Sequence, residues 1–160
     1  ETSFPFEVVV GDDVSTDGTR DILLGLQKQY PDRLRLLFHE KNLGNMGKPN
    51  FMAVFEACRG EFFAFLDGDD YWNSPGKLQM QVAALERNPG WSAHSHGLMI
   101  LRGEKEASPA RTSIPAGVTE LTPRELIRHE FPHSMTLMIR RRTFPGLPPW
   151  FLDVYVRLIL

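Results

Sequence analysis

The sequence has little cysteine, no long apolar run and no excess of basic residues. Its single cysteine, Cys58, excludes an internal disulfide and fits a reducing compartment. No apolar stretch approaches the roughly 20 residues that a membrane-spanning helix needs. A net charge of −2 provides no basic surface for nucleic acid. The 160 residues, 42% hydrophobic and 24% charged, therefore predict one globular domain in the cytoplasm.

An apolar segment that ends at three carboxylates is the most informative feature of the chain. Residues 62–66 are apolar, and Asp67, Asp69 and Asp70 follow them directly. A run of this kind is typical of a buried strand, and open α/β sheets bind ligands at the carboxyl ends of their strands. Gly68 allows a tight turn between two hard oxygen ligands. Carboxylates in this arrangement suit Mg²⁺ or Mn²⁺, which commonly bind together with a phosphate.

A second strand is also expected to end in acidic residues. The β-branched residues 8–10 are followed by Asp12 and Asp13, and then by Ser15 and Asp17, which are typical helix caps. Parallel strands bring their carboxyl ends to the same edge of a sheet. We therefore expect the two groups of acids to converge on one pocket for a cation and a diphosphate.

The rest of the pattern alternates strands with helices in the first 90 residues, and it predicts an α/β fold with a mostly parallel, mixed sheet flanked by helices. One side of the first helix carries an apolar stripe that includes Ile22, Leu26 and Tyr30. The expected strands are 6–10, 34–38, 61–66, 91–101 and 135–139, and the expected helices are 16–30, 49–58, 75–88 and 122–129.

Three segments in the first 89 residues resemble family 2 glycosyltransferases. The string from Val8 to Thr19 is similar to that family's "DDGSTDGT" segment, and Asn42-Leu43-Gly44 to its "NLG". The string from Phe65 to Trp72 is similar to "FLDxDDxW". The resemblance implies the GT-A nucleotide-sugar fold, with residues 1–89 as the nucleotide-binding half and 90–160 as the acceptor-side half. It also implies a strand and a helix before residue 7, so we expect 1–160 to be a single, N-terminally incomplete domain.

A nucleotide-sugar donor needs a cation that neutralises its diphosphate as the sugar leaves. We expect Asp69 to bind this Mn²⁺ or Mg²⁺ ion directly. Asp67 would contact the ribose, or the ion through water, and Asp70 would support them from behind. The resemblance implies the same roles. The alternative for this segment is a polar turn or an adventitious Ca²⁺ site.

The other predicted nucleotide contacts are Asp12, Asp13 and Lys48. A carboxylate that faces a base or ribose selects it by accepting hydrogen bonds, and the resemblance places Asp13 on the base with Asp12 nearby. Lys48 would neutralise the diphosphate. The alternatives are helix capping for the acids and a solvated loop for the lysine.

Inverting transfer also needs a base that accepts the proton of the acceptor hydroxyl. The resemblance favours Asp153, which follows Pro149-Trp150-Phe151, and leaves Glu130 and His133 as options. It implies a single displacement without a covalent enzyme intermediate.

The predicted function is transfer of a sugar, with inversion, from a UDP-sugar to a glycan or a lipid-linked acceptor in surface polysaccharide biosynthesis. The predicted location is the cytoplasm, with peripheral association at the inner face of the membrane as an option. Two alternatives stay open: a sugar-phosphate nucleotidyltransferase, and a non-catalytic module that binds nucleotide.

Overall fold

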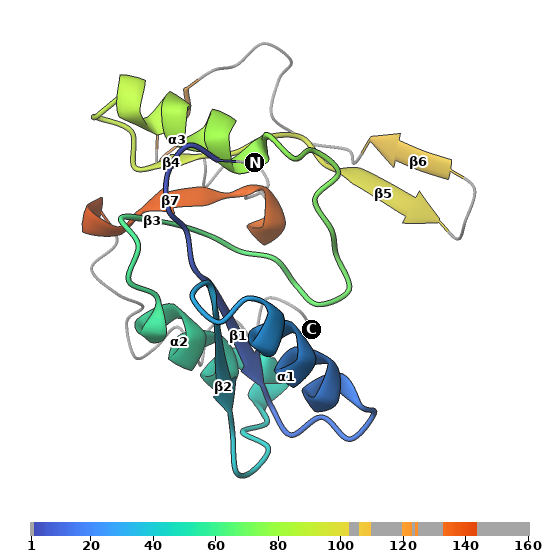
Figure 1. The fold of residues 1–160 in the computed structure, drawn as a ribbon. Helices are drawn as coiled ribbons and strands as arrows, with labels where there is room; N and C mark the ends of the chain where they lie inside the picture. The colour runs from blue at the N-terminus through green and yellow to red at the C-terminus, as the bar shows by residue number, and fades with distance from the viewer. Residues whose placement is uncertain (1, 103–105, 110–119, 123, 125–132, 144–160) are drawn as a thin grey trace. The chain divides into compact units, whose positions relative to one another are not determined.

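The computed structural model describes residues 2–102, 106–109, 120–122, 124 and 133–143. These residues fall into two compact units, 2–61 and 62–143 (Figure 1). Hydrogen bonds between the described strands form three separate sheets.

The first unit is built on a parallel strand–helix–strand motif. Strand β1 (Val8–Asp12) is followed by helix α1 (Thr19–Gln29) and strand β2 (Leu34–Phe38). The strands pair in parallel, from Val8 opposite Leu34 to Asp12 opposite Phe38. Both strands therefore end at the same edge, as parallel pairing requires.

Helix α1 does not bury the apolar stripe that the sequence predicts. It contains no buried residue, and Ile22, Leu26 and Tyr30 are all exposed, Ile22 by 66%. The stripe is therefore not a buried face of α1 in this structure. Amphipathic spacing identified the helix but not the face that it packs.

Helix α2 (Lys48–Ala57) packs closely on β1 and follows the short 3₁₀ turn η1 (Asn45–Gly47). Gly11 permits this approach, because a Cβ at that position would collide with Asn50 Oδ1 and lie 2.5 Å from Val54 Cγ2. Proline occupies the first turn of α2, as expected, since it has no N–H to leave unpaired there.

The second unit contains an antiparallel sheet in the order β3-β7-β4. Its strands are β3 (Phe62–Ala64), β7 (Met138–Arg140) and β4 (Ala93–His94), and Ala64 lies opposite Met138. Helix α3 (Lys77–Arg87) contacts β4 and β7, and buries Lys77, Gln81, Val82 and Leu85. The short 3₁₀ turns η2 (Ser134–Thr136) and η3 (Arg141–Thr143) flank β7.

The expected mostly parallel sheet is not confirmed. Among the strands that the structure describes, only β1 and β2 pair in parallel. Strands β3, β4 and β7 pair antiparallel, as do β5 (Met99–Arg102) and β6 (Glu106–Pro109). The predicted strand 91–101 is interrupted between β4 and β5. In this segment side chains contact backbone carbonyls that would otherwise pair with a neighbouring strand. Gln81 Nε2 donates to His94 O at 3.3 Å, and a His96 ring nitrogen lies 2.6 Å from Gly97 O.

A buried arginine joins α3 to the second unit's sheet. Arg140 is 5% exposed and its guanidinium lies 5.0 Å from the centre of the Phe62 ring. It donates to Leu85 O at 2.6 Å and to Trp91 O at 3.2 Å. Leu85 O also accepts the N–H of Asn88, the C-cap of α3, so Arg140 adds a second donor to a carbonyl in the last turn of the helix.

Candidate functional site

Asp12, the last residue of β1, is committed to an ion pair. It is 3% exposed, and its carboxylate accepts hydrogen bonds from Arg20 Nε and from the Ser15 N–H. Arg20 also donates to His39 O at 2.8 Å, so it ties α1 to the end of β2. Burial alone would raise the pKa of Asp12, but the bonds from Ser15 and Arg20 and the Arg20 charge together lower it. The carboxylate is ionised and fully engaged within the unit.

The turn after Asp12 holds a valine in the left-handed region. Val14 has φ 65°, a conformation in which a β-branched residue is a clear outlier. The corresponding position of the "DDGSTDGT" pattern is glycine. Asp17 lies immediately before Gly18, the N-cap of α1, and its Oδ1 accepts the Thr19 N–H at 3.1 Å and the Thr19 hydroxyl at 2.6 Å. Asp17 therefore engages the first N–H of α1, which agrees with its predicted place at the start of this helix, although the N-cap itself is Gly18.

Asp13 organises the loop that precedes α2. Its Oδ1 accepts the Leu43 N–H at 2.7 Å, and Asn42 Nδ2 donates to its carbonyl at 3.0 Å. Gly44, Asn45, Met46 and Gly47 all have positive φ, so this loop turns sharply. Among the described residues, Asp13 Oδ2 has no hydrogen-bond partner. One carboxylate oxygen thus holds the loop while the other is available to a ligand.

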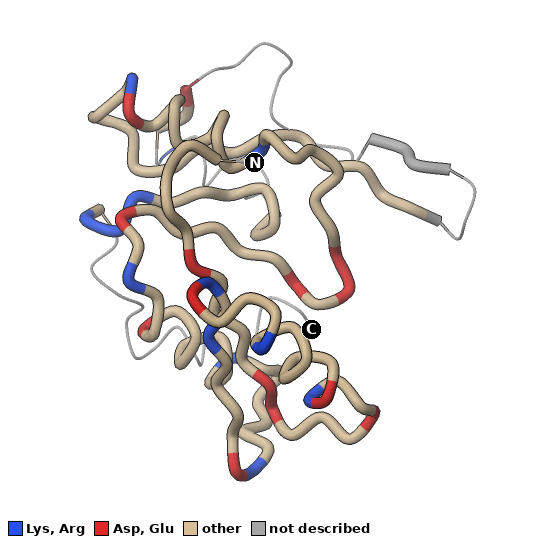
Figure 2. The backbone as a smooth tube through the Cα atoms, viewed as in Figure 1, with Lys and Arg blue, Asp and Glu red and all other residues tan. Residues whose placement is uncertain are grey.

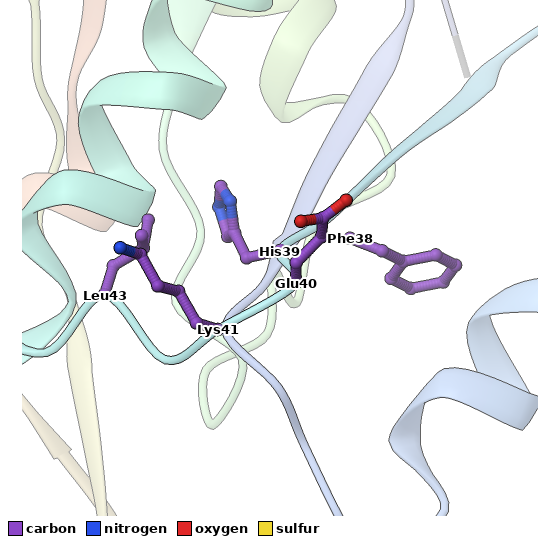
Figure 3. A pocket seen from close by; sticks show the side chains of 5 residues that line it. All are labelled: Phe38, His39, Glu40, Lys41 and Leu43. Carbon is purple, nitrogen blue, oxygen red and sulfur yellow. The ribbon is translucent and has the colours of Figure 1, made fainter.

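A shallow hollow of about 550 Å³ lies beside the end of β2 and is lined by Phe38, His39, Glu40, Lys41 and Leu43. In Figure 3, Phe38 extends away from Lys41 and Leu43.

His39 is fixed by a polar chain. Its Nε2 lies 2.9 Å from Asn50 Oδ1, and Asn50 Nδ2 donates to Gly11 O at 3.1 Å. Because Asn50 Oδ1 only accepts, His39 carries its proton on Nε2.

Lys48 is the first residue of α2 and is 5% exposed. It is therefore not part of a solvated loop, which was the alternative that the sequence allowed. Its predicted contact with a diphosphate stays a prediction.

The acidic segment after β3 forms an exposed turn. The Asp70 N–H donates to Asp67 O at 3.1 Å, which closes the turn over Gly68 and Asp69. Asp67 and Asp69 are exposed and Asp70 is half-buried. Figure 2 shows this acidic stretch in the loop that follows β3. In the part of the chain that the structure describes, no three His, Cys, Asp or Glu side chains are grouped to hold a metal ion.

The predicted metal ligands therefore amount to two carboxylates on one turn. Their oxygen atoms fit Mg²⁺ or Mn²⁺, both of which bind through one or two carboxylates and take further ligands from phosphates and water. Metal binding itself stays a prediction, as does the convergence of Asp13 with Asp69, because these residues lie in different units.

A buried polar cluster lies behind the acidic turn. Lys77 Nζ donates to Gln81 Oε1 at 2.6 Å and sits 4.3 Å from the centre of the Trp72 ring. Gln81 Nε2 donates to Thr136 O at 2.9 Å and lies 3.4 Å from His94 Nδ1. Burial, then the neighbouring charges of His96 and Lys77, lower the pKa of His94. His94 is thus a neutral, half-buried member of this cluster at pH 7.

Sequence reasoning missed the residues that support the predicted ones. It did not single out Arg20, His39 or Asn50. His39 was within reach, because it follows a predicted strand at its carboxyl end. Arg20 and Asn50 carry no such signal, since a polar residue in the first turn of a helix is common. The predicted bases Asp153 and Glu130 lie outside the described residues, and His133 is exposed.

Comparison with known proteins identifies the class. The model of the family described as "Glycosyl transferase family 2" matches residues 2–143. The chain therefore belongs to glycosyl transferase family 2, whose members have the GT-A fold. No solved structure matches it significantly.

The similar curated proteins are bacterial. "Uncharacterized protein Rv1520" of Mycobacterium tuberculosis is 31% identical over 160 residues, covering 96% of this chain and 45% of that protein. "Uncharacterized glycosyltransferase alr2836" of Nostoc is 37% identical over 115 residues, covering 72% and 34%. "Poly(ribitol-phosphate) beta-N-acetylglucosaminyltransferase TarS" of Staphylococcus aureus is 46% identical over 70 residues, covering 42% and 11%. The chain thus spans less than half the length of each of these relatives.

Proposed function

We propose that this chain is part of an inverting glycosyltransferase that moves a sugar from a UDP-sugar to a hydroxyl group of a glycan or lipid-linked acceptor. The observation that carries the proposal is the turn at Asp67–Asp70, which presents two exposed carboxylates shortly after β3, with Phe65 and Leu66 in between. Family membership supports the reaction class. The similarity to TarS, which is named as a poly(ribitol-phosphate) beta-N-acetylglucosaminyltransferase, supports an acceptor among cell-surface polymers.

On the donor side, we assign Asp13 to the nucleotide. Its Oδ1 is held by the Leu43 N–H, which fixes the carboxylate in one orientation. A fixed acceptor discriminates between bases, because a wrong base leaves it without a hydrogen bond. Asp12 has a supporting role in this proposal, since its carboxylate is occupied by Arg20 and Ser15. Lys48 would act on the diphosphate from the start of α2.

Asp69 would hold the divalent cation, Mn²⁺ or Mg²⁺, and Asp67 would assist through water or bind the ribose. When bound, such an ion stabilises the negative charge that develops on the departing diphosphate. The chain's own contribution is a turn that keeps the two carboxylates, separated by Gly68, exposed and accessible to ligand. Asp70, which is half-buried, would support the turn from behind.

On the acceptor side, we assign the general base to Asp153, with Glu130 and His133 as the other choices. The base would take the acceptor proton as the hydroxyl oxygen attacks the anomeric carbon and the nucleoside diphosphate leaves, so that the configuration inverts. No helix in the described part of the chain is long and apolar enough to span a membrane. We place the reaction in the cytoplasm, at the inner membrane face where the acceptor is lipid-linked.

Calorimetric titration with UDP, with and without Mn²⁺, tests the donor site. Asp69→Ala is expected to abolish the Mn²⁺-dependent part of UDP binding, and Asp13→Ala to weaken binding with or without the metal. Asp21→Ala, which removes an exposed acid in the first turn of α1, is the matched control and should bind as the wild type does. Unchanged Mn²⁺-dependent binding in Asp69→Ala would refute the proposal. Release of pyrophosphate from UTP and a sugar phosphate would indicate a nucleotidyltransferase instead.

A further inference from the structure

The buried ammonium group of Lys77 contacts Trp72, two residues after the acidic turn, and is not paired with a carboxylate among the described residues. Lys77 is 4% exposed, and its Nζ donates to Gln81 Oε1 at 2.6 Å. The same group sits 4.3 Å from the centre of the Trp72 ring. Its partners are thus a neutral amide and the face of an aromatic ring.

This arrangement is costly for folding alone. Burial without a counter-charge disfavours the ammonium form and lowers the pKa of Lys77 to about 8. An apolar side chain of similar length would fill the same space without that penalty. The cation is therefore expected to serve something other than packing, and its contact with Trp72 shows where to look.

Trp72 is held by its ring face rather than by its indole N–H. Its Nε1 is buried and has no hydrogen-bond partner within the described residues. In contrast, Trp91 Nε1 donates to Glu120 at 2.9 Å. The attraction between an ammonium group and an aromatic face is thus the directional polar contact that orients Trp72.

Trp72 follows Asp70 by two positions, so its anchoring fixes the C-terminal end of the acidic turn. The N-terminal end is fixed by β3, where Ala64 pairs with Met138. At the C-terminal end, Trp72 contacts Lys77, Lys77 bonds to Gln81, and Gln81 donates to Thr136 O, two residues before Met138. Both ends of the acidic segment are therefore fastened to the same stretch of chain, residues 136–138.

We propose that Lys77 is a positioning residue for the cation site: its ammonium group holds Trp72, and Trp72 fixes the turn that carries Asp67 and Asp69. The inference rests on the proposed function, since it assumes that these carboxylates bind the cation of a nucleoside diphosphate. Lys77 itself does not touch the ligand. Loss of its charge is expected to loosen the turn and weaken cation binding, because ligand geometry is sensitive to small displacements.

The test measures Mn²⁺ binding in the presence of UDP by the loss of the free-ion signal in electron paramagnetic resonance. Lys77→Met should weaken binding about tenfold, the scale of a desolvated cation–π contact. Lys77→Arg keeps a cation over the ring and should bind within about twofold of the wild type. Lys28→Met, at an exposed lysine in the last turn of α1, is the matched control and should have no effect.

A second pair of variants guards against misfolding of Lys77→Met. Trp72→Phe keeps an aromatic face and should retain most of the binding, whereas Trp72→Leu should lose as much as Lys77→Met. Lys77→Met combined with Trp72→Leu should be no weaker than either alone, because both changes break one contact. Additive losses in the double variant, or an equally large loss in Lys77→Arg, would overturn the inference.

Asp69→Ala separates this inference from the proposed function. If Asp69→Ala binds Mn²⁺ and UDP as the wild type does, the assignment of the cation site fails. If Asp69→Ala loses binding while Lys77→Met retains it, the cation site stands and the role of Lys77 is wrong.

Discussion

The two units place a charged side chain in their interior in different ways. In residues 2–61 one buried group is the carboxylate of Asp12, and the guanidinium of Arg20 pairs with it. In residues 62–143 one buried group is the ammonium of Lys77, which contacts an amide and an aromatic ring. Acids lie close by in the second unit, yet within the described residues Asp67 and Asp69 form no ion pair with Lys77 or any other residue.

The difference separates acids that serve folding from acids that remain accessible. A carboxylate paired with an internal arginine is satisfied and has little left for a ligand. A cation that is satisfied by neutral groups leaves nearby carboxylates unpaired and exposed. The second arrangement lowers the stability of the fold. We expect it where a bound cation neutralises the carboxylates that the protein leaves unpaired.

The largest effect expected from this comparison is on stability in the first unit. Asp12→Ala leaves Arg20 and the Ser15 N–H without their acceptor and should lower the free energy of unfolding by about 3 kcal/mol. Because the pKa of Asp12 is lowered, its contribution is present above the ordinary pKa of an aspartate and is lost as pH falls through the folded pKa. Urea unfolding at several pH values measures both effects. If the surface variant Asp21→Ala lost as much unfolding free energy as Asp12→Ala, the buried ion pair would have no special role in stability.

A somewhat smaller loss is expected at Gln81, which is 1% exposed. Gln81→Leu leaves the Lys77 ammonium without its acceptor and Thr136 O without its donor, and should cost about 2 kcal/mol. Combination with Lys77→Met should recover part of that loss, because an apolar pair replaces a broken polar one. A double-mutant cycle on unfolding free energies measures the coupling, and simple additivity would show that the two side chains act independently.

The Lys77 charge should be visible in the pH dependence of stability. The folded pKa of about 8 lies below the ordinary value of 10.5, so between these values the unfolded chain binds more protons. Stability should therefore rise with pH in that window, by at most about 1.4 kcal/mol per pH unit.

The increase in stability with pH should disappear in Lys77→Met. It should remain in Lys28→Met, which changes an exposed lysine. At pH 7, Lys77→Met is expected to be at least as stable as the wild type, unlike Asp12→Ala. The other shifted group in the cluster, His94, titrates below its ordinary pKa of 6.5 and contributes outside this window. A clear loss of stability in Lys77→Met at pH 7 would contradict the comparison.

The smallest effect concerns the turn after β1. Val14→Gly relieves a left-handed valine and should stabilise the chain by up to about 1 kcal/mol, after the extra entropy of glycine in the unfolded state is subtracted. Val10→Gly makes the same chemical change within extended β1 and should destabilise instead. Thermal unfolding distinguishes the two, and loss of stability in both variants would show that Val14 contributes more by packing than it costs in strain.

The local elements were predictable because their signals are local. Alternating apolar runs, Pro49 and the acidic strand ends identified β1, α2 and the turn after β3. The family followed from the same strings, and the match over residues 2–143 confirms it. Strand direction was not predictable, because a three-residue strand such as β3 looks the same in either orientation. Nor were the polar partners Arg20 and Gln81, whose roles depend on residues 8 and 55 positions away along the chain.

Because Asp12 pairs with Arg20, substitutions of the adjacent residues Asp12 and Asp13 are expected to have different consequences. Under the proposed function, a descendant that had stopped transferring sugar would still need Asp12 to stay folded, whereas the constraint on Asp13 and Asp69 would relax. An intact first aspartate is therefore a poor guide to activity in related chains. A degenerate pseudoenzyme would keep it and lose the others.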